Sequence, residues 1–225
     1  MKIVSIQLAQ SVRLLDISDF LAKVYLPDAS KALVEKYGFM RTPTFDELNS
    51  PTGGVFVHGK FMVGSRAVRI DLFHIYSNAL MASTKTSTDD ADAFLDEVVV
   101  FASEHLGASA DLATPSGTTH LSKLEVELDI PLERTFPFLD PIGKRISEMV
   151  RSFASDLAPT FQLTGLNFFF DTSKLAMTPF QPFSLERRVQ KPFDSNLYFA
   201  QAPLKTSEHV SVLEELERIL RANQR

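Results

Sequence analysis

The tripeptide Lys-Thr-Ser occurs twice, as Lys85-Thr86-Ser87 and as Lys205-Thr206-Ser207, and an amphipathic segment of helical periodicity follows each copy. A lysine beside hydroxyl groups at a helix N-terminus combines a point charge, free backbone N–H groups and the positive end of the helix dipole. Such a site binds a phosphate or a carboxylate. The alternative interpretation is that Ser87 and Ser207 cap their helices. We favour the caps because neither copy has the glycines that let a backbone close around an anion.

Three polar side chains fall on adjacent predicted strands, where a histidine–carboxylate pair or an incomplete metal site could form: His58, Asp71 and His74. Asp71 and His74 are an odd number of residues apart, so a regular strand directs them to opposite faces. Exposed or satisfied histidines are therefore the favoured interpretation, and we expect no metal.

An acidic cluster surrounds the start of the helix that follows Ser87; its members are Asp89, Asp90, Asp92, Asp96 and Glu97. Carboxylate oxygens can hold a divalent cation. The spacing is not that of an EF-hand loop, so we interpret the cluster as a complement to the helix dipole on a solvated face.

A basic and aromatic segment runs from Phe183 to Phe193 and contains Arg187, Arg188 and Lys191. Surfaces of this kind can stack bases and neutralise phosphates. Alternation would place Arg187 and Arg188 on opposite faces of a sheet, so we predict an edge strand protected by charge, with these side chains as an interaction surface. The run Phe168-Phe169-Phe170 is typical of a central strand buried on both faces.

Several functional classes have no support in the sequence. It contains no G-x-S-x-G elbow, dinucleotide fingerprint, Walker sequence or HExxH motif. The absence of cysteine excludes disulfides, thiolate metal sites and a cysteine nucleophile. A formal charge of -5 gives no general attraction for nucleic acid. We therefore expect no cofactor, and we expect a binding protein rather than an enzyme.

The elements that must position these residues follow one order twice: strand, helix, three strands, helix. The first copy is predicted from alternation and from helical spacing at residues 2–8, 27–37, 55–63, 67–76, 79–86 and 89–106. The second is predicted at residues 121–128, 141–153, 161–170, 183–189, 197–204 and 208–222. Consecutive strands with short links pair antiparallel, and each amphipathic helix must bury its stripe. The fold class is therefore α+β, with an antiparallel sheet or sheets and helices on one face.

Repetition of short motifs supports a tandem duplication of this β-α-β-β-β-α unit. Ser77-Asn78 and Ser195-Asn196 precede the two Lys-Thr-Ser copies at similar distances. We predict a first copy at residues 1–107, a linker at 108–118 and a second copy at 119–225. This element order is similar to that of the duplicated saddle of the TATA-binding protein and, more loosely, to helix-grip folds.

These observations favour a cytoplasmic, non-enzymatic module that binds another protein or itself through the second half. An N-terminus that alternates in polarity, and the lack of a long apolar run, predict neither a signal peptide nor a membrane span. The alternative is a small-anion or nucleotide-binding protein, or a motif-poor enzyme, with a site at the seam between the copies.

Overall fold

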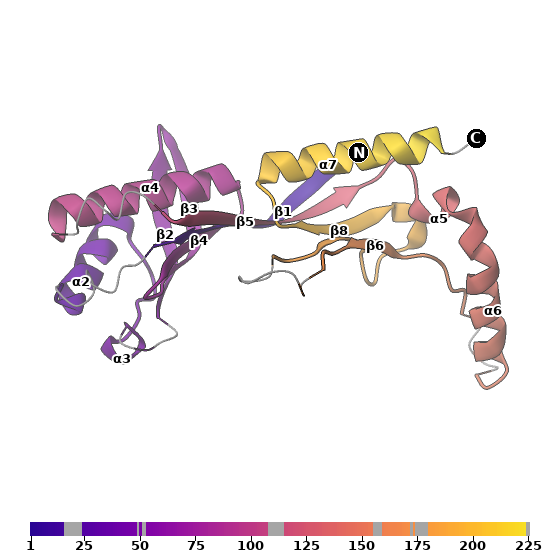
Figure 1. Cartoon of the computed structure of the whole chain (residues 1–225), viewed down its shortest axis with the longest axis horizontal. Coiled ribbons are helices and arrows are strands. Elements are labelled where there is room, and N and C mark those ends of the chain that lie inside the picture. The colour runs from indigo at the N-terminus through magenta and orange to yellow at the C-terminus, as the bar shows by residue number, and fades with distance from the viewer. Residues whose placement is uncertain are drawn as a thin grey trace. The chain divides into compact units, whose positions relative to one another are not determined.

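The computed structural model describes residues 1–15, 24–48, 50, 53–107, 115–154, 159–171, 173 and 180–223 (Figure 1). The strands are β1 (Lys2–Leu14), β2 (Gly54–Val63), β3 (Arg66–Ile75), β4 (Ala79–Thr84), β5 (Gly117–Glu127), β6 (Gly165–Phe168), β7 (Phe183–Arg187) and β8 (Leu197–Ala202). The helices are α2 (Leu26–Tyr37), α3 (Phe45–Leu48), α4 (Thr88–His105), α5 (Leu132–Thr135), α6 (Asp140–Arg151) and α7 (Thr206–Ala222). No helix in these ranges is long and apolar enough to cross a membrane.

The eight strands form one sheet in the order β2-β3-β4-β1-β5-β8-β7-β6. The strands β2, β3 and β4 form the predicted antiparallel meander, and β6, β7 and β8 form a second one. This order is symmetric about its middle. Counted inward from the two edges, β6 takes the place of β2, β7 that of β3, β8 that of β4 and β5 that of β1. The antiparallel α+β fold is confirmed, whereas the duplication stays a prediction.

The described residues form two compact units. The N-terminal unit contains residues 6–123 and 203–208, and the C-terminal unit contains residues 1–5, 124–202 and 209–225. Strands β1 and β5 contribute residues to both. Most of the predicted linker, residues 108–114, lies outside the described residues, so the predicted domain limits stay a prediction.

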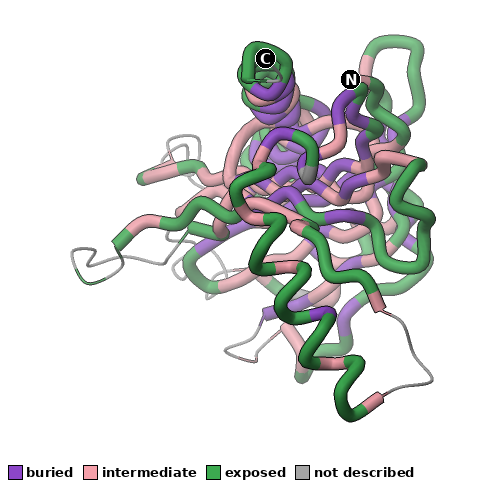
Figure 2. Tube along the Cα trace, turned by 90° about the vertical axis from the view of Figure 1, so that its right-hand side faces the viewer, coloured by how far each residue is buried: buried purple, intermediate pink, exposed green. Residues whose placement is uncertain are grey.

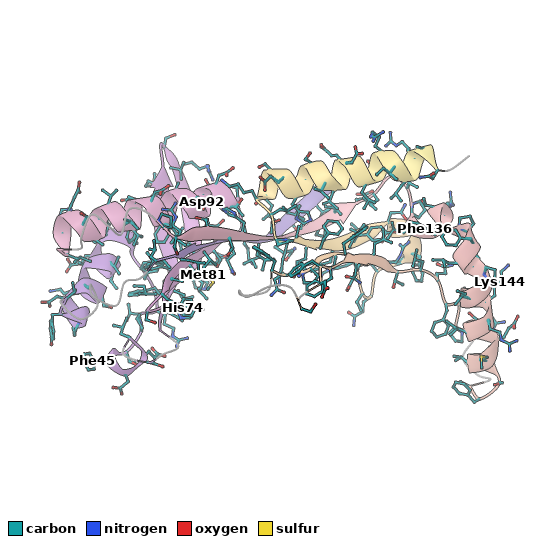
Figure 3. All side chains as sticks on the ribbon, viewed as in Figure 1. Phe45, His74, Met81, Asp92, Phe136 and Lys144 are labelled. Atoms are coloured by element: carbon teal, nitrogen blue, oxygen red, sulfur yellow. The ribbon has the colours of Figure 1, made fainter. Side chains whose placement is uncertain are left out.

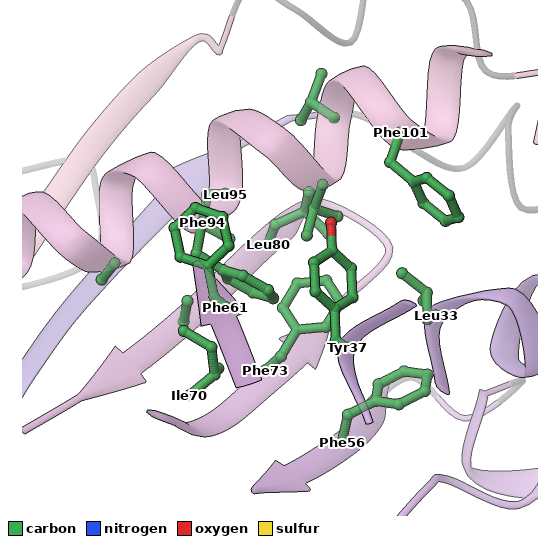
Figure 4. Packing of buried hydrophobic residues seen from close by; sticks show 14 of the residues in the cluster. Leu33, Tyr37, Phe56, Phe61, Ile70, Phe73, Leu80, Phe94, Leu95 and Phe101 are labelled. Atoms are coloured by element: carbon green, nitrogen blue, oxygen red, sulfur yellow. The ribbon is translucent and has the colours of Figure 1, made fainter. Parts of the chain in front are cut away.

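The core of the N-terminal unit joins α2 and α4 to the inner face of β2, β3 and β4 (Figure 4). Phe94 on α4 is its centre: its ring centroid lies 5.1 Å from that of Tyr37, 5.3 Å from Phe73 and 5.6 Å from Phe61. Gly38 ends α2 with φ of 63°, as its position after the apolar stripe predicts. Phenylalanine suits this core because it fills volume without a polar group to satisfy.

The core of the C-terminal unit is built mainly from aliphatic side chains. Fully buried residues come from β5, β7, β8 and α7: Leu124, Val126, Leu185, Tyr198, Ala200, Leu213 and Leu220. The hydroxyl of Tyr198 accepts a hydrogen bond of 3.2 Å from the backbone N–H of Leu132, which fixes the start of α5. The phenol therefore has the partner that a buried polar group requires.

Strand β6 is shorter than predicted. It covers only four of the ten residues expected between 161 and 170, and the residues before it pack against α6 instead. Phe168 and Phe169 are 61% and 60% exposed, so the prediction of a strand buried on both faces is wrong. Strand β6 is an edge of the sheet, where one side lacks a neighbouring strand to cover it.

Candidate functional site

The first Lys-Thr-Ser copy is a helix cap. The Ser87 hydroxyl accepts a hydrogen bond of 3.0 Å from the backbone N–H of Asp90, so Ser87 is the N-cap of α4. Thr86 donates its own N–H and hydroxyl to the Thr84 hydroxyl. Lys85 is exposed and lies three residues before the helix begins. These contacts hold the turn together and leave Lys85 outside it.

The second copy has a different arrangement. Helix α7 begins at Thr206, so Ser207 lies inside its first turn and is exposed rather than capping it. The backbone N–H of Lys205 instead donates to the Glu208 carboxylate at 3.1 Å. The Lys205 ammonium lies 3.3 Å from Asp92, and this hydrogen bond raises the pKa of Lys205. A second carboxylate, that of Asp89, lies 3.8 Å away and would repel an incoming anion.

The first residues of the two helices bond to each other. The Thr88 N–H donates to the Thr206 hydroxyl at 3.0 Å, and the Thr206 N–H donates to the Thr88 hydroxyl at 2.9 Å. Both residues are buried. Because an anion site needs free N–H groups at the helix start, this pair weakens the case for the predicted sites at Lys85 and Lys205.

Asp92, which is labelled in Figure 3, is the centre of a polar network in the N-terminal unit. Its carboxylate accepts hydrogen bonds from the Ser11 hydroxyl on β1 and from the His120 ring on β5 at 3.0 Å, besides its contact with Lys205. Burial alone would raise the pKa of Asp92, but the bonds from His120 and Ser11 outweigh it and lower the pKa to about 2. Asp92 is therefore ionised at neutral pH.

The same network lacks the geometry of nucleophilic catalysis. In that chemistry a serine donates to a histidine, which a carboxylate then orients. Here Ser11 and His120 both bond to Asp92, so the histidine is not positioned to take the serine proton through these contacts. We interpret the network as structural: it links α4 to β1, to β5 and to the residue before α7.

The remaining acidic residues of the predicted cluster also lie beside cations, and the side chains of Asp89 and Asp96 are 65% and 66% exposed, as a solvated face requires. Asp90 binds Arg66 through two bonds of 2.6 and 3.1 Å, and Glu97 lies 2.6 Å from Lys36. Asp96 pairs with Arg13. Within the described ranges, no group of three acidic, histidine or cysteine side chains is arranged to hold a metal ion.

The histidines on β2 and β3 have separate environments. The His58 ring lies 3.9 Å from the Asp71 carboxylate, which also binds Arg69 at 2.6 Å. His74 stacks on Tyr76 with ring centroids 3.7 Å apart. The prediction that Asp71 and His74 face opposite sides of the sheet fits these contacts. The contacts of His58, Asp71 and His74 do not join the three residues in one site.

The basic and aromatic segment is built around a buried arginine. The Arg187 guanidinium donates to the Phe193 carbonyl and lies 4.5 Å from the Phe193 ring centroid and 5.0 Å from that of Tyr198. Arg188 is exposed and lies 3.4 Å from Glu125. The Phe183 ring meets the rings of two neighbours, Phe168 and His209. Strand β7 lies between β6 and β8, so the predicted edge strand is wrong.

Helix α6 carries an exposed apolar surface that the sequence analysis did not identify. Four exposed apolar residues form what we call the α6 stripe: Ile142, Ile146 and Met149 on α6, and Phe153 in the turn that follows the helix end at Arg151. Their exposed fractions run from 39% at Ile146 to 78% at Phe153. In Figure 2, α6 is the helix nearest the viewer, and most of its length is exposed. Scattered apolar residues are ordinary on a surface, whereas a group of exposed apolar residues in one place is a feature that many binding surfaces share.

The adjoining side of α6 is fixed by its own chain. The Ser147 hydroxyl accepts from the backbone N–H of Phe161 at 2.9 Å and donates to the Gly143 carbonyl at 2.7 Å. A side chain on Gly143 would collide with the Phe161 carbonyl, so glycine permits this close approach. A groove of about 360 Å³ runs between α6 and residues 160–163, with Ile142 and Ile146 in its wall.

Comparisons with known proteins do not assign this chain to a family. No model of a known protein family matches it. A search of curated protein sequences also finds no significant match.

Proposed function

We propose that this protein is a cytoplasmic, non-enzymatic module that binds another protein through the α6 stripe. The observation that carries the proposal is the exposure of the α6 stripe, which lies on α6 and in the turn after it, while the adjoining side of the helix is packed on Phe161. Burying such side chains on a partner is favourable, at about 25 cal/mol for each Å² removed from water. The cytoplasmic location rests on the sequence alone, and cell fractionation tests it.

The contacts elsewhere support binding over catalysis. Ser87, Thr88 and Thr206 occupy the helix N-terminal groups that a bound anion would use. Asp92 is held ionised by its neighbours and is poorly suited to move a proton near neutral pH. By contrast, the α6 stripe stays 39% to 78% exposed, although two of its residues, Ile142 and Ile146, also line the groove against residues 160–163.

A photoreactive amino acid tests this proposal directly. We would introduce it at Met149 and, as a matched control, at Val212, an exposed apolar residue of α7. Irradiation of cells that make the full chain should give a cross-linked adduct of defined mass from position 149 and none from position 212. The proposal fails if position 149 gives no adduct, or if both positions give the same set.

We also propose that the two halves arose by tandem duplication. The mirrored strand order supports it, and so does the spacing of the elements. Thr88 and Thr206 begin α4 and α7 at a separation of 118 residues, and Ser77-Asn78 and Ser195-Asn196 share that separation. Aligned sequences of relatives should show the two halves to be more similar to each other at this offset than at any other.

A further inference from the structure

We draw no further inference here: the strongest candidate, the apolar sheet face of the N-terminal unit that points away from α4 and carries Val12, Met81 and Val55, supports no proposal because nothing in the residues that the structure describes shows what covers it.

Discussion

Replacing Asp92 with asparagine should destabilise the N-terminal unit by an amount that depends on pH. The substitution keeps the shape of the side chain but removes the charge that binds His120 and Lys205. The pKa of Asp92 is lowered from 3.8 to about 2, despite burial that would raise it. At about 1.4 kcal/mol for each pKa unit, this difference corresponds to roughly 2.5 kcal/mol. The carboxylate is only 16% exposed, so solvent screens it little.

The direction of the pH dependence follows from the lowered pKa. A carboxyl group whose pKa is lower in the folded state stabilises the fold at pH above its unfolded value of 3.8, and that contribution is lost as the pH falls through about 2. The difference in free energy of unfolding between wild type and Asp92→Asn should be roughly 2.5 kcal/mol at pH 7, about half of that at pH 3, and small at pH 2.

Urea unfolding followed by circular dichroism between pH 2 and 7 measures this difference. Asp89→Asn is the matched control, because it makes the same change on the same helix at a side chain that is 65% exposed. It should change the stability by less than about 0.5 kcal/mol at any pH. Equal stabilities of wild type and Asp92→Asn at pH 7, or a difference that is constant down to pH 2, would refute the reasoning.

Three further predictions concern the helix starts and the buried arginine. Ser87→Ala should lower the free energy of unfolding by about 1 kcal/mol, and Ser207→Ala should leave it unchanged, because only the first hydroxyl caps a helix. In chemical denaturation, Thr88→Val and Thr206→Val should each destabilise, and their double-mutant cycle should show a coupling of at least about 0.5 kcal/mol, whereas additive effects would contradict the reciprocal bonds. Arg187→Met should cost about 1 to 3 kcal/mol in thermal unfolding, because it leaves the carbonyl to which the guanidinium donates without that donor.

Most elements of the fold could be predicted because their signals are local. Gly38 ends α2 in the left-handed conformation that glycine favours, and Ser87 caps α4 as expected. The prediction of an edge strand at β7 was wrong because strand order depends on which strands pair. The sequence of residues 183–187 does not indicate that β6 pairs beside them. The prediction that residues 168–170 form a buried central strand was wrong for a related reason. An apolar run can have the same sequence in a buried strand and at an exposed edge.

The two Lys-Thr-Ser copies stand at different distances from the helices that follow them. The copies are 120 residues apart in the sequence, whereas the first residues of α4 and α7 are 118 apart. Lys205 is therefore adjacent to its helix, and Lys85 is separated from its helix by two residues. The feature that the two helix starts share is the reciprocal bonding between Thr88 and Thr206. A bond between residues so distant in the chain leaves no local signal.

The α6 stripe was predicted as part of a helix but not as a surface, and the comparison with α2 shows why. Both helices follow the first strand of their half and carry apolar residues at helical spacing. In α2 the side chains of Leu33 and Tyr37 are buried in the aromatic core, whereas Ile146 and Met149 of α6 remain exposed. Periodicity reports an apolar face but not what covers it. Because α2 buries its apolar side chains whereas α6 leaves Ile146 and Met149 exposed, only α6 of these two helices has apolar surface for the partner that we propose.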